Sequence, residues 1–128
     1  MKSKKPKRTR PQMPHASEEM KRWSAMLGSE LDRWPKVSVR PMFGLRGFYR
    51  GKNIFAALPV TRSIRNPNSL IFRIAPMPPE LLQRTGKDSR IDTGNRVPSS
   101  KWITFEISSE ADFRDALWWL NQAYEHAK

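Results

Sequence analysis

The chain of 128 residues offers few side chains whose type and spacing could support catalysis. It has no cysteine, which excludes disulfides, thiolate nucleophiles and cysteine-ligated metal sites. His15 lies in a proline-rich N-terminal arm and His126 in the last turn of the expected final helix, so we interpret both as surface residues. The serines have no neighbouring base to activate them. We therefore expect no enzymatic activity, no metal, no cofactor and no small-molecule substrate.

Two polar stretches in the second half could be mistaken for ligand sites. Residues 85–89, TGKDS, carry part of a phosphate-binding loop, but Leu81 stands where that loop needs its first glycine. Asp88 and Asp92 have neither the spacing of a calcium loop nor that of a catalytic carboxylate pair. Both stretches are interpreted as solvated loop.

The distribution of charge is more informative than any motif. The formal net charge is +12, from 24 Lys or Arg and 12 Asp or Glu. Residues 33–79 contain cations from Arg33 to Arg73 and no acidic residue. Such asymmetry favours a polyanionic partner, nucleic acid in particular. A basic surface that serves only solubility would give the same excess, and the sequence leaves both interpretations open.

The elements that must position these charges follow from periodicity. Residues 1–16 are basic and rich in proline, and we expect a disordered arm; residues 17–128 are expected to form a single domain. Ser17 is a suitable N-cap for an amphipathic helix that ends at Pro35. Its two tryptophans are expected to pack in the core. A second amphipathic helix follows Ser109 and runs to the C-terminus.

Between these helices the sequence alternates as strands do. Residues 37–58 predict a hairpin with a tight basic turn at residues 50–53, and residues 70–74 and 102–107 predict two further strands. Prolines 78 and 79 begin a short helix, and residues 87–101 are expected to be an irregular connection. The predicted fold class is α+β, with a mainly antiparallel sheet of about five strands and the two terminal helices packed on it.

Two surfaces are candidate binding sites. The first is a nucleic-acid surface, on which five cations of the hairpin and the following loop are expected to converge and on which Phe48 or Tyr49 could stack on bases. The second is the C-terminal helix, where Trp118 points away from the apolar stripe. Trp118 is expected either to contact a protein partner or a second copy in a homodimer, or to be covered by a loop of its own chain. No apolar run is long enough to cross a membrane, and we expect a cytoplasmic protein. The candidate nucleic-acid-binding residues are Arg40, Arg46, Arg50, Lys52, Arg62 and Arg65, with Lys4, Lys5, Lys7 and Arg8 of the arm; the five expected to converge are Arg46, Arg50, Lys52, Arg62 and Arg65.

The hairpin also carries a family resemblance. Residues 40–44, RPMFG, followed by residues 47–49, GFY, a Gly-Lys turn and residues 54–56, IFA, resemble the N-terminal domain of TfoX (Sxy) proteins. The family's second glycine is Leu45 here. The closing strand and helix, residues 101–124, are similar to those of the same domain and of the MmcQ/YjbR-like proteins. This resemblance implies a small α+β domain without known catalysis, linked in TfoX proteins to regulation of DNA uptake and in YjbR-like proteins to DNA binding.

Overall fold

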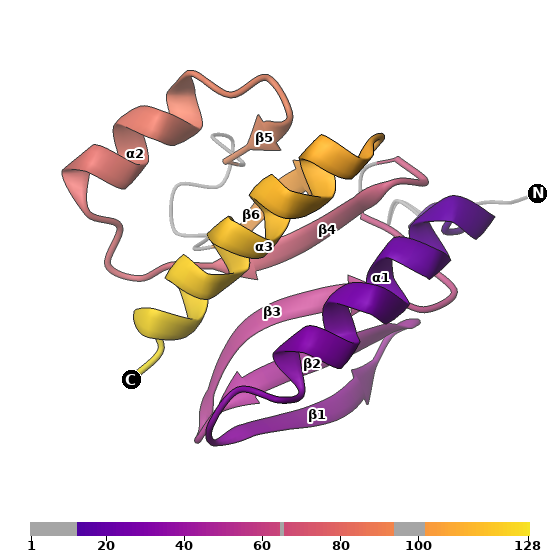
Figure 1. The fold of residues 1–128 in the computed structure, drawn as a ribbon, viewed down its shortest axis with the longest axis horizontal. Coiled ribbons are helices and arrows are strands. Elements are labelled where there is room, and N and C mark those ends of the chain that lie inside the picture. Colours follow the sequence, from indigo (N-terminus) through magenta and orange to yellow (C-terminus); the bar gives the residue numbers. More distant parts are fainter. Residues whose placement is uncertain (1–12, 65, 94–101) are drawn as a thin grey trace, which may run out of the picture.

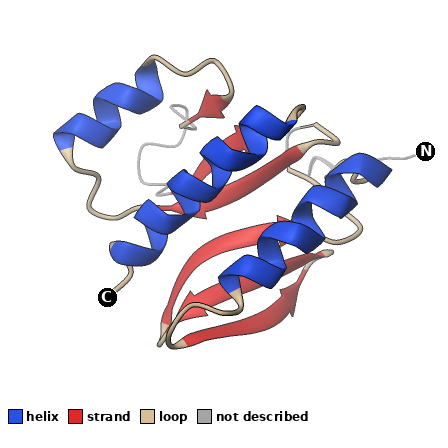
Figure 2. Cartoon of the chain, in the orientation of Figure 1, coloured by secondary structure: helices blue, strands red, loops and turns tan. Residues whose placement is uncertain are grey.

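The computed structural model describes residues 13–64, 66–93 and 102–128, which form three helices and six strands (Figures 1 and 2). The strands pair antiparallel in the order β1-β2-β3-β4-β6-β5. The predicted α+β class with an antiparallel sheet is confirmed. In chain order the elements are α1 (Glu18–Leu31), β1 (Val37–Met42), β2 (Leu45–Arg50), β3 (Asn53–Pro59), β4 (Ser69–Arg73), α2 (Pro79–Gly86), β5 (Ile91–Asp92), β6 (Trp102–Glu106) and α3 (Glu110–Glu125).

The sheet has six strands rather than about five because residues 91 and 92 pair with β6. These two residues lie in the segment that the sequence predicted as an irregular connection. A strand this short has no alternating pattern to read, since its pairing is set by the neighbouring strand rather than by its own sequence.

Helices α1 and α3 lie across the same face of the sheet, as Figure 1 shows. The Trp23 ring of α1 lies 5.4 Å from the Phe113 ring of α3, so the two helices also contact each other. Helix α2 packs beside β5 and places Leu81 in the same core. No helix in the described ranges covers the opposite face of the sheet.

Aromatic side chains fill the space between the helices and the sheet. Trp34, just after α1, lies 6.4 Å from the Phe55 ring and 5.0 Å from the Tyr124 ring. Phe72 of β4 stacks on Trp119 of α3 at 5.6 Å. Burying a side chain of this size stabilises the fold by about 2–3 kcal/mol. The predicted core role of the tryptophans of the first helix is therefore confirmed for Trp23 and Trp34, although α1 itself ends at Leu31.

Both long helices begin where the sequence predicts. The Ser17 hydroxyl accepts the Met20 N–H at 2.9 Å, and Ser109 accepts the Asp112 N–H at 3.2 Å. Each cap satisfies one of the free N–H groups of a first helical turn. Among the described residues, no helix combines the length and the apolar character needed to cross a bilayer.

Residues 13–16, which the sequence places in the arm, belong to the folded part. The Ala16 N–H donates to the Thr61 carbonyl at 3.0 Å, and the Ser63 N–H donates to the Pro14 carbonyl at 2.8 Å. Ala16 is buried. Composition misses such a segment because backbone pairing with a loop needs few apolar side chains. Residues 1–12 of the expected arm lie outside the described residues.

Candidate nucleic-acid interface

The strand register decides which side chains lie on the sheet face opposite α1 and α3. Val39 and Phe48 are register partners and both pack against the core. Because side chains alternate along a strand, their neighbours Arg40 and Tyr49 point the other way. The Arg40 guanidinium lies 5.3 Å from the centroid of the Tyr49 ring, a cation–π contact. We call this side the open face; in β1 to β4 it carries Arg40, Met42, Tyr49, Ile54, Ile71 and Arg73.

Gly47 allows the side chains around Tyr49 to meet. A Cβ at this position would lie 2.9 Å from the Met42 sulfur and 3.2 Å from Cδ1 of Ile54. Glycine therefore lets these two side chains and the Tyr49 ring close over the strand. The result is an apolar floor beneath the Arg40 guanidinium.

Strand β4 extends the open face. Phe72 faces the helices through its stacking on Trp119, so Ile71 and Arg73 lie on the other side and are half-buried. Arg73 is paired in register with Trp102 of β6. The helices pack on one face of this strand, and Ser69, Leu70 and Phe72 are fully buried. Arg73 was not among the predicted binding residues. It is the one charged residue of an apolar strand, and the alternation of side chains along that strand could have assigned it to the open face.

The β1–β2 hairpin ends in an exposed aromatic residue. Phe43 and Gly44 form a two-residue turn with φ of +50° and +82°, the pattern of a type I′ turn. Phe43 is 84% exposed. A left-handed backbone costs a bulky L residue about 1–2 kcal/mol, and Phe43 recovers little of this by burial. Phe43 was not among the predicted binding residues, although its position directly before a glycine indicates a turn.

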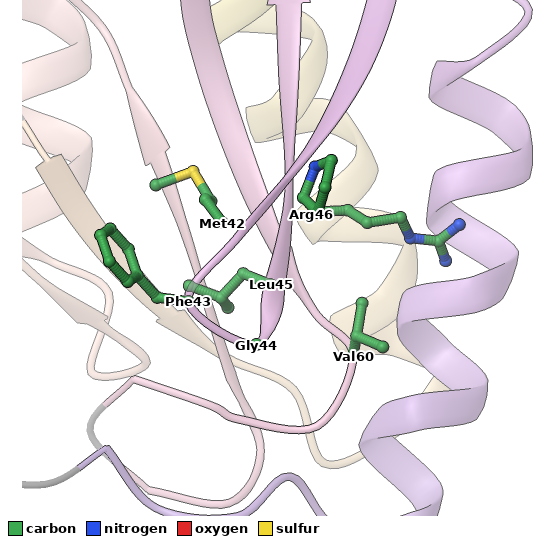
Figure 3. Close-up of a pocket in the computed structure, with 7 residues that line it drawn as sticks. Met42, Phe43, Gly44, Leu45, Arg46 and Val60 are labelled. Carbon is green, nitrogen blue, oxygen red and sulfur yellow. The ribbon is translucent and has the colours of Figure 1, made fainter.

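Backbone hydrogen bonds hold this turn against the loop after β3. The Gly44 carbonyl accepts the N–H groups of Val60, Thr61 and Arg62 at 2.9 to 3.1 Å. Figure 3 shows the open pocket of about 600 Å³ at this tip, lined mainly by apolar residues of the hairpin together with Val60. Phe43 and Met42 project to one side of the ribbon, and Arg46 projects to the other side, toward α1.

The predicted cations that the structure describes do not converge on one surface. Arg46 and Arg50 lie on the helix-covered side: the Arg50 Nη1 donates to the Tyr124 carbonyl at 2.9 Å, and its guanidinium stacks 4.2 Å from the Tyr124 ring. Lys52 is exposed in the β2–β3 turn, at the end of the hairpin away from Gly44. The Arg62 Nη1 donates to the Met13 carbonyl at 3.0 Å.

Of the predicted cations that the structure describes, Arg40 lies on the open face. The separation follows from register, because Arg40 pairs with Gly47 and so points opposite to Arg46. The predicted residues Arg65, Lys4, Lys5, Lys7 and Arg8 lie outside the described residues. Phe48, the other ring considered for stacking, is buried at 1% exposure.

The charged residues on the open side of β1 to β4 are all basic. Strands β1 to β4 and their connections contain no acidic residue, since residues 33–79 have none. The acidic residues of α1 lie on the opposite side of the sheet. In the described strands, the carboxylates that register places on the open side are Asp92 on β5 and Glu106 on β6, the strand that pairs with β4. The half of the open face around Arg40 and Arg73 is therefore free of carboxylates from its own strands.

Trp118 lies on α3 as the second candidate surface requires. It is 38% exposed and makes a T-shaped contact with Trp119 at 5.0 Å. The Arg84 guanidinium of α2 stacks on it at 4.3 Å from the ring centroid. Part of its surface is thus occupied by α2 rather than by solvent.

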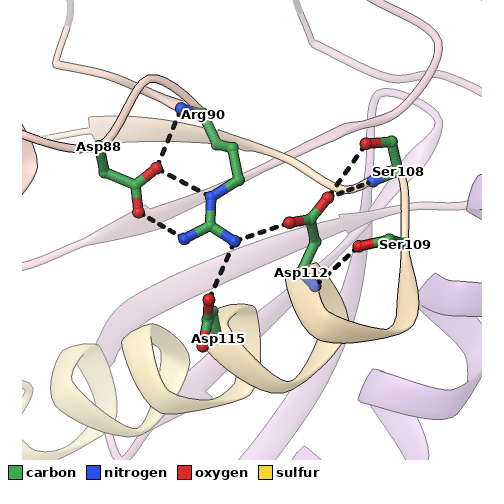
Figure 4. A network of polar contacts seen from close by, with 6 residues as sticks. All are labelled: Asp88, Arg90, Ser108, Ser109, Asp112 and Asp115. Carbon is green, nitrogen blue, oxygen red and sulfur yellow. Dashed lines mark hydrogen bonds and ion pairs between the residues drawn. The ribbon is translucent and has the colours of Figure 1, made fainter.

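Arg90 forms the densest polar cluster, shown in Figure 4. Its Nε and Nη2 bind Asp88 at 2.8 and 2.6 Å, and its Nη1 binds Asp112 at 2.7 Å and Asp115 at 3.0 Å. The hydrogen bonds from Arg90 lower the pKa of Asp88. Burial would raise the pKa of Asp112, but hydrogen bonds from the Ser108 N–H and from Arg90 outweigh it, so this pKa is also lowered. The cluster clamps the loop after α2 to the start of α3, because one guanidinium binds carboxylates of both segments.

His15 pairs through its backbone with Arg62, and the His126 ring Nδ1 lies 2.9 Å from the Gln122 carbonyl, so the two histidines belong to different parts of the fold. Within the described ranges, no three His, Asp or Glu side chains are placed to hold a metal ion. Comparison of the chain with protein-family models, with curated proteins and with solved structures gave no match.

Proposed function

We propose that this protein is a non-catalytic regulatory domain that binds nucleic acid through the open face. The observation that carries the proposal is the pairing of Arg40 with Tyr49, together with Arg73, on a sheet half without carboxylates of its own. Arginine binds phosphate oxygens in a bidentate manner, and an aromatic ring beside it offers a surface for a sugar or a base. Cations of the N-terminal arm, Lys4, Lys5, Lys7 and Arg8, would add sequence-independent contacts with phosphates.

The geometry favours binding that depends on charge more than on sequence. Phosphate contacts fix a protein on a nucleic acid but carry no sequence information. An antiparallel sheet face with half-buried apolar residues between two arginines can hold a backbone in several registers. We therefore expect weak sequence preference and strong salt dependence.

The test is a fluorescence-anisotropy titration of a labelled single strand and of its duplex at several salt concentrations. The double variant Arg40→Ala, Arg73→Ala is expected to weaken binding and to reduce the slope of log K against log salt by about 1.4 for a single strand, because two phosphate contacts are lost. The matched control is Lys21→Ala, Arg33→Ala. It removes two cations that pair with acids of α1 on the other side of the sheet, and should leave the slope unchanged. Failure of the wild-type protein to bind either ligand at low salt would reject the proposal.

The resemblance to the TfoX N-terminal domain and to YjbR-like proteins is part of this proposal. It rests on residues 40–56 and, less specifically, on residues 101–124. Both groups are compatible with a small regulatory domain that acts in the cytoplasm.

A second candidate is a protein-interaction module that acts through α3, with the basic surface serving solubility. It is favoured by the 38% exposure of Trp118, which is high for a tryptophan on a helix. Sedimentation equilibrium of the wild-type protein and of Trp118→Ala distinguishes the two. A dimer that the substitution disrupts would support this candidate, and a monomer at all concentrations would remove self-association from it.

A further inference from the structure

Phe43 combines three features that the core of the protein does not explain. It is a large aromatic side chain, it is almost fully exposed, and it occupies a left-handed position at which type I′ turns favour Asn, Asp or Gly. A residue in such a conformation contributes little to stability, so its side chain is free to serve an outside partner.

We propose that Phe43 is a base-stacking residue that gives the protein a preference for single-stranded nucleic acid. This inference rests on the proposed function and deepens it. Figure 3 shows that Phe43 projects with Met42 to the side of the ribbon away from α1, which is the side of the open face. Its ring therefore stands at the end of the surface that carries Arg40 and Tyr49.

The spacing along the hairpin suits an extended strand. Tyr49 lies four residues along β2 from Leu45, where the turn ends, which corresponds to about 13 Å at 3.3 Å per residue. Arg40 lies between the turn and the far end of β1, with its guanidinium over the Tyr49 ring. A strand crossing from Phe43 toward Tyr49 would thus pass a cation able to hold its phosphate.

The exposed Phe43 ring distinguishes single-stranded from double-stranded nucleic acid. In a duplex the faces of the bases are already stacked on one another, whereas the bases of a single strand can lie on an aromatic side chain. The open pocket of about 600 Å³ beside Phe43 leaves room for a base against the ring. Charge complementarity selects nucleic acid over a protein partner, because residues 33–79, which include the whole tip, contain cations and no acid.

The experiment compares wild type, Phe43→Asn and Phe43→Tyr by anisotropy with three ligands: a single strand, an abasic strand of the same length and a duplex. Asparagine suits the turn, so Phe43→Asn keeps the fold while it removes the ring. We expect Phe43→Asn to bind the single strand about 5- to 150-fold more weakly, the range of one lost stacking contact. Its affinity for the abasic strand and for the duplex, and its salt slope, should match wild type because no phosphate contact is lost. Phe43→Tyr should retain the affinity of wild type.

The outcomes separate this inference from the function on which it rests. Wild-type binding that Phe43→Asn leaves unchanged for the single strand would overturn the stacking role while the open-face proposal stands. Absence of wild-type binding to any ligand at low salt would overturn both. Self-association that Phe43→Asn abolishes, with an unchanged affinity for the single strand, would assign the tip to a second copy of the chain and overturn the inference.

Discussion

Replacing Gly44 by alanine tests how the β1–β2 turn is held. The φ of +82° is unfavourable for alanine by about 1–2 kcal/mol. The new Cβ would also lie 2.6 Å from Cγ of Arg62 and 2.9 Å from Oγ1 of Thr61, an overlap that costs about 1–3 kcal/mol. Reduced freedom of the unfolded chain returns about 0.4–1 kcal/mol. We expect Gly44→Ala to lower the free energy of unfolding by about 2–4 kcal/mol.

Gly51→Ala is the matched control for this change. Gly51 also has a positive φ, +61°, but in the described part of the chain no heavy atom outside its immediate neighbours comes within 4 Å of the added Cβ. It therefore carries the backbone cost without the overlap, and we expect a loss of about 1 kcal/mol or less. The measurement is urea unfolding followed by tryptophan fluorescence, with the free energies compared at a shared m-value.

The difference between the two variants isolates the packing of the tip against the loop after β3. Equal losses would refute the reasoning, because they would mean that the loop moves aside at no cost. Such a result would also contradict the role of the Gly44 carbonyl as a fixed acceptor for three N–H groups.

Three further predictions concern stability. Phe43→Asn should raise the free energy of unfolding by about 0.5–1 kcal/mol, because Asn tolerates the left-handed backbone. A lower free energy of unfolding than wild type in urea would show instead that the ring packs on the protein. Arg90→Met should lower it by about 2 kcal/mol, since Asp88 and Asp112 would stay partly buried without their partner. Both carboxylates have a lowered pKa, so their contribution is present above the unfolded value near 3.9 and lost as pH falls through the folded value. Urea unfolding between about pH 2 and pH 6 should show this loss in wild type and a flatter profile in Arg90→Met; parallel profiles would exclude the clamp as its source. Tyr124→Phe removes a 2.7 Å hydrogen bond to a backbone carbonyl and should cost about 1 kcal/mol in the same assay, and no loss would mean that the bond is replaced by water.

Local patterns predicted most of the fold. Ser17 and Ser109 predicted where the two long helices begin, because a hydroxyl before an amphipathic stretch accepts a hydrogen bond from a free N–H group of the first helical turn. Alternation and glycine predicted the β2–β3 hairpin, whose turn at Gly51 has the positive φ that glycine permits. The two-residue β5 and the pairing of residues 13–16 with the loop after β3 could not be predicted, because their hydrogen bonds join residues far apart in the sequence.

The candidate site was predicted only in part. The sequence singled out Arg40 and, as one of two rings, Tyr49, but grouped Arg40 with Arg46 and Arg50, which lie on the other side of the sheet. It assigned no binding role to Phe43 or to Arg73. These errors share one cause: the face of a strand residue depends on register and on which side the helices pack, and neither is written in a local stretch of sequence.

The amino-acid sequence by itself determined the class of each element, the capped starts of the long helices and a stretch of 47 residues, 33–79, with cations and no acids. Only the tertiary structure decided which of those cations share a surface. Both long helices pack on one side of the sheet, and the pairing of Arg40 with Gly47 turns Arg40 to the other side. The physical reason is that alternation has a period of two, so a single step in register moves a charge from the helix-covered face to the open one.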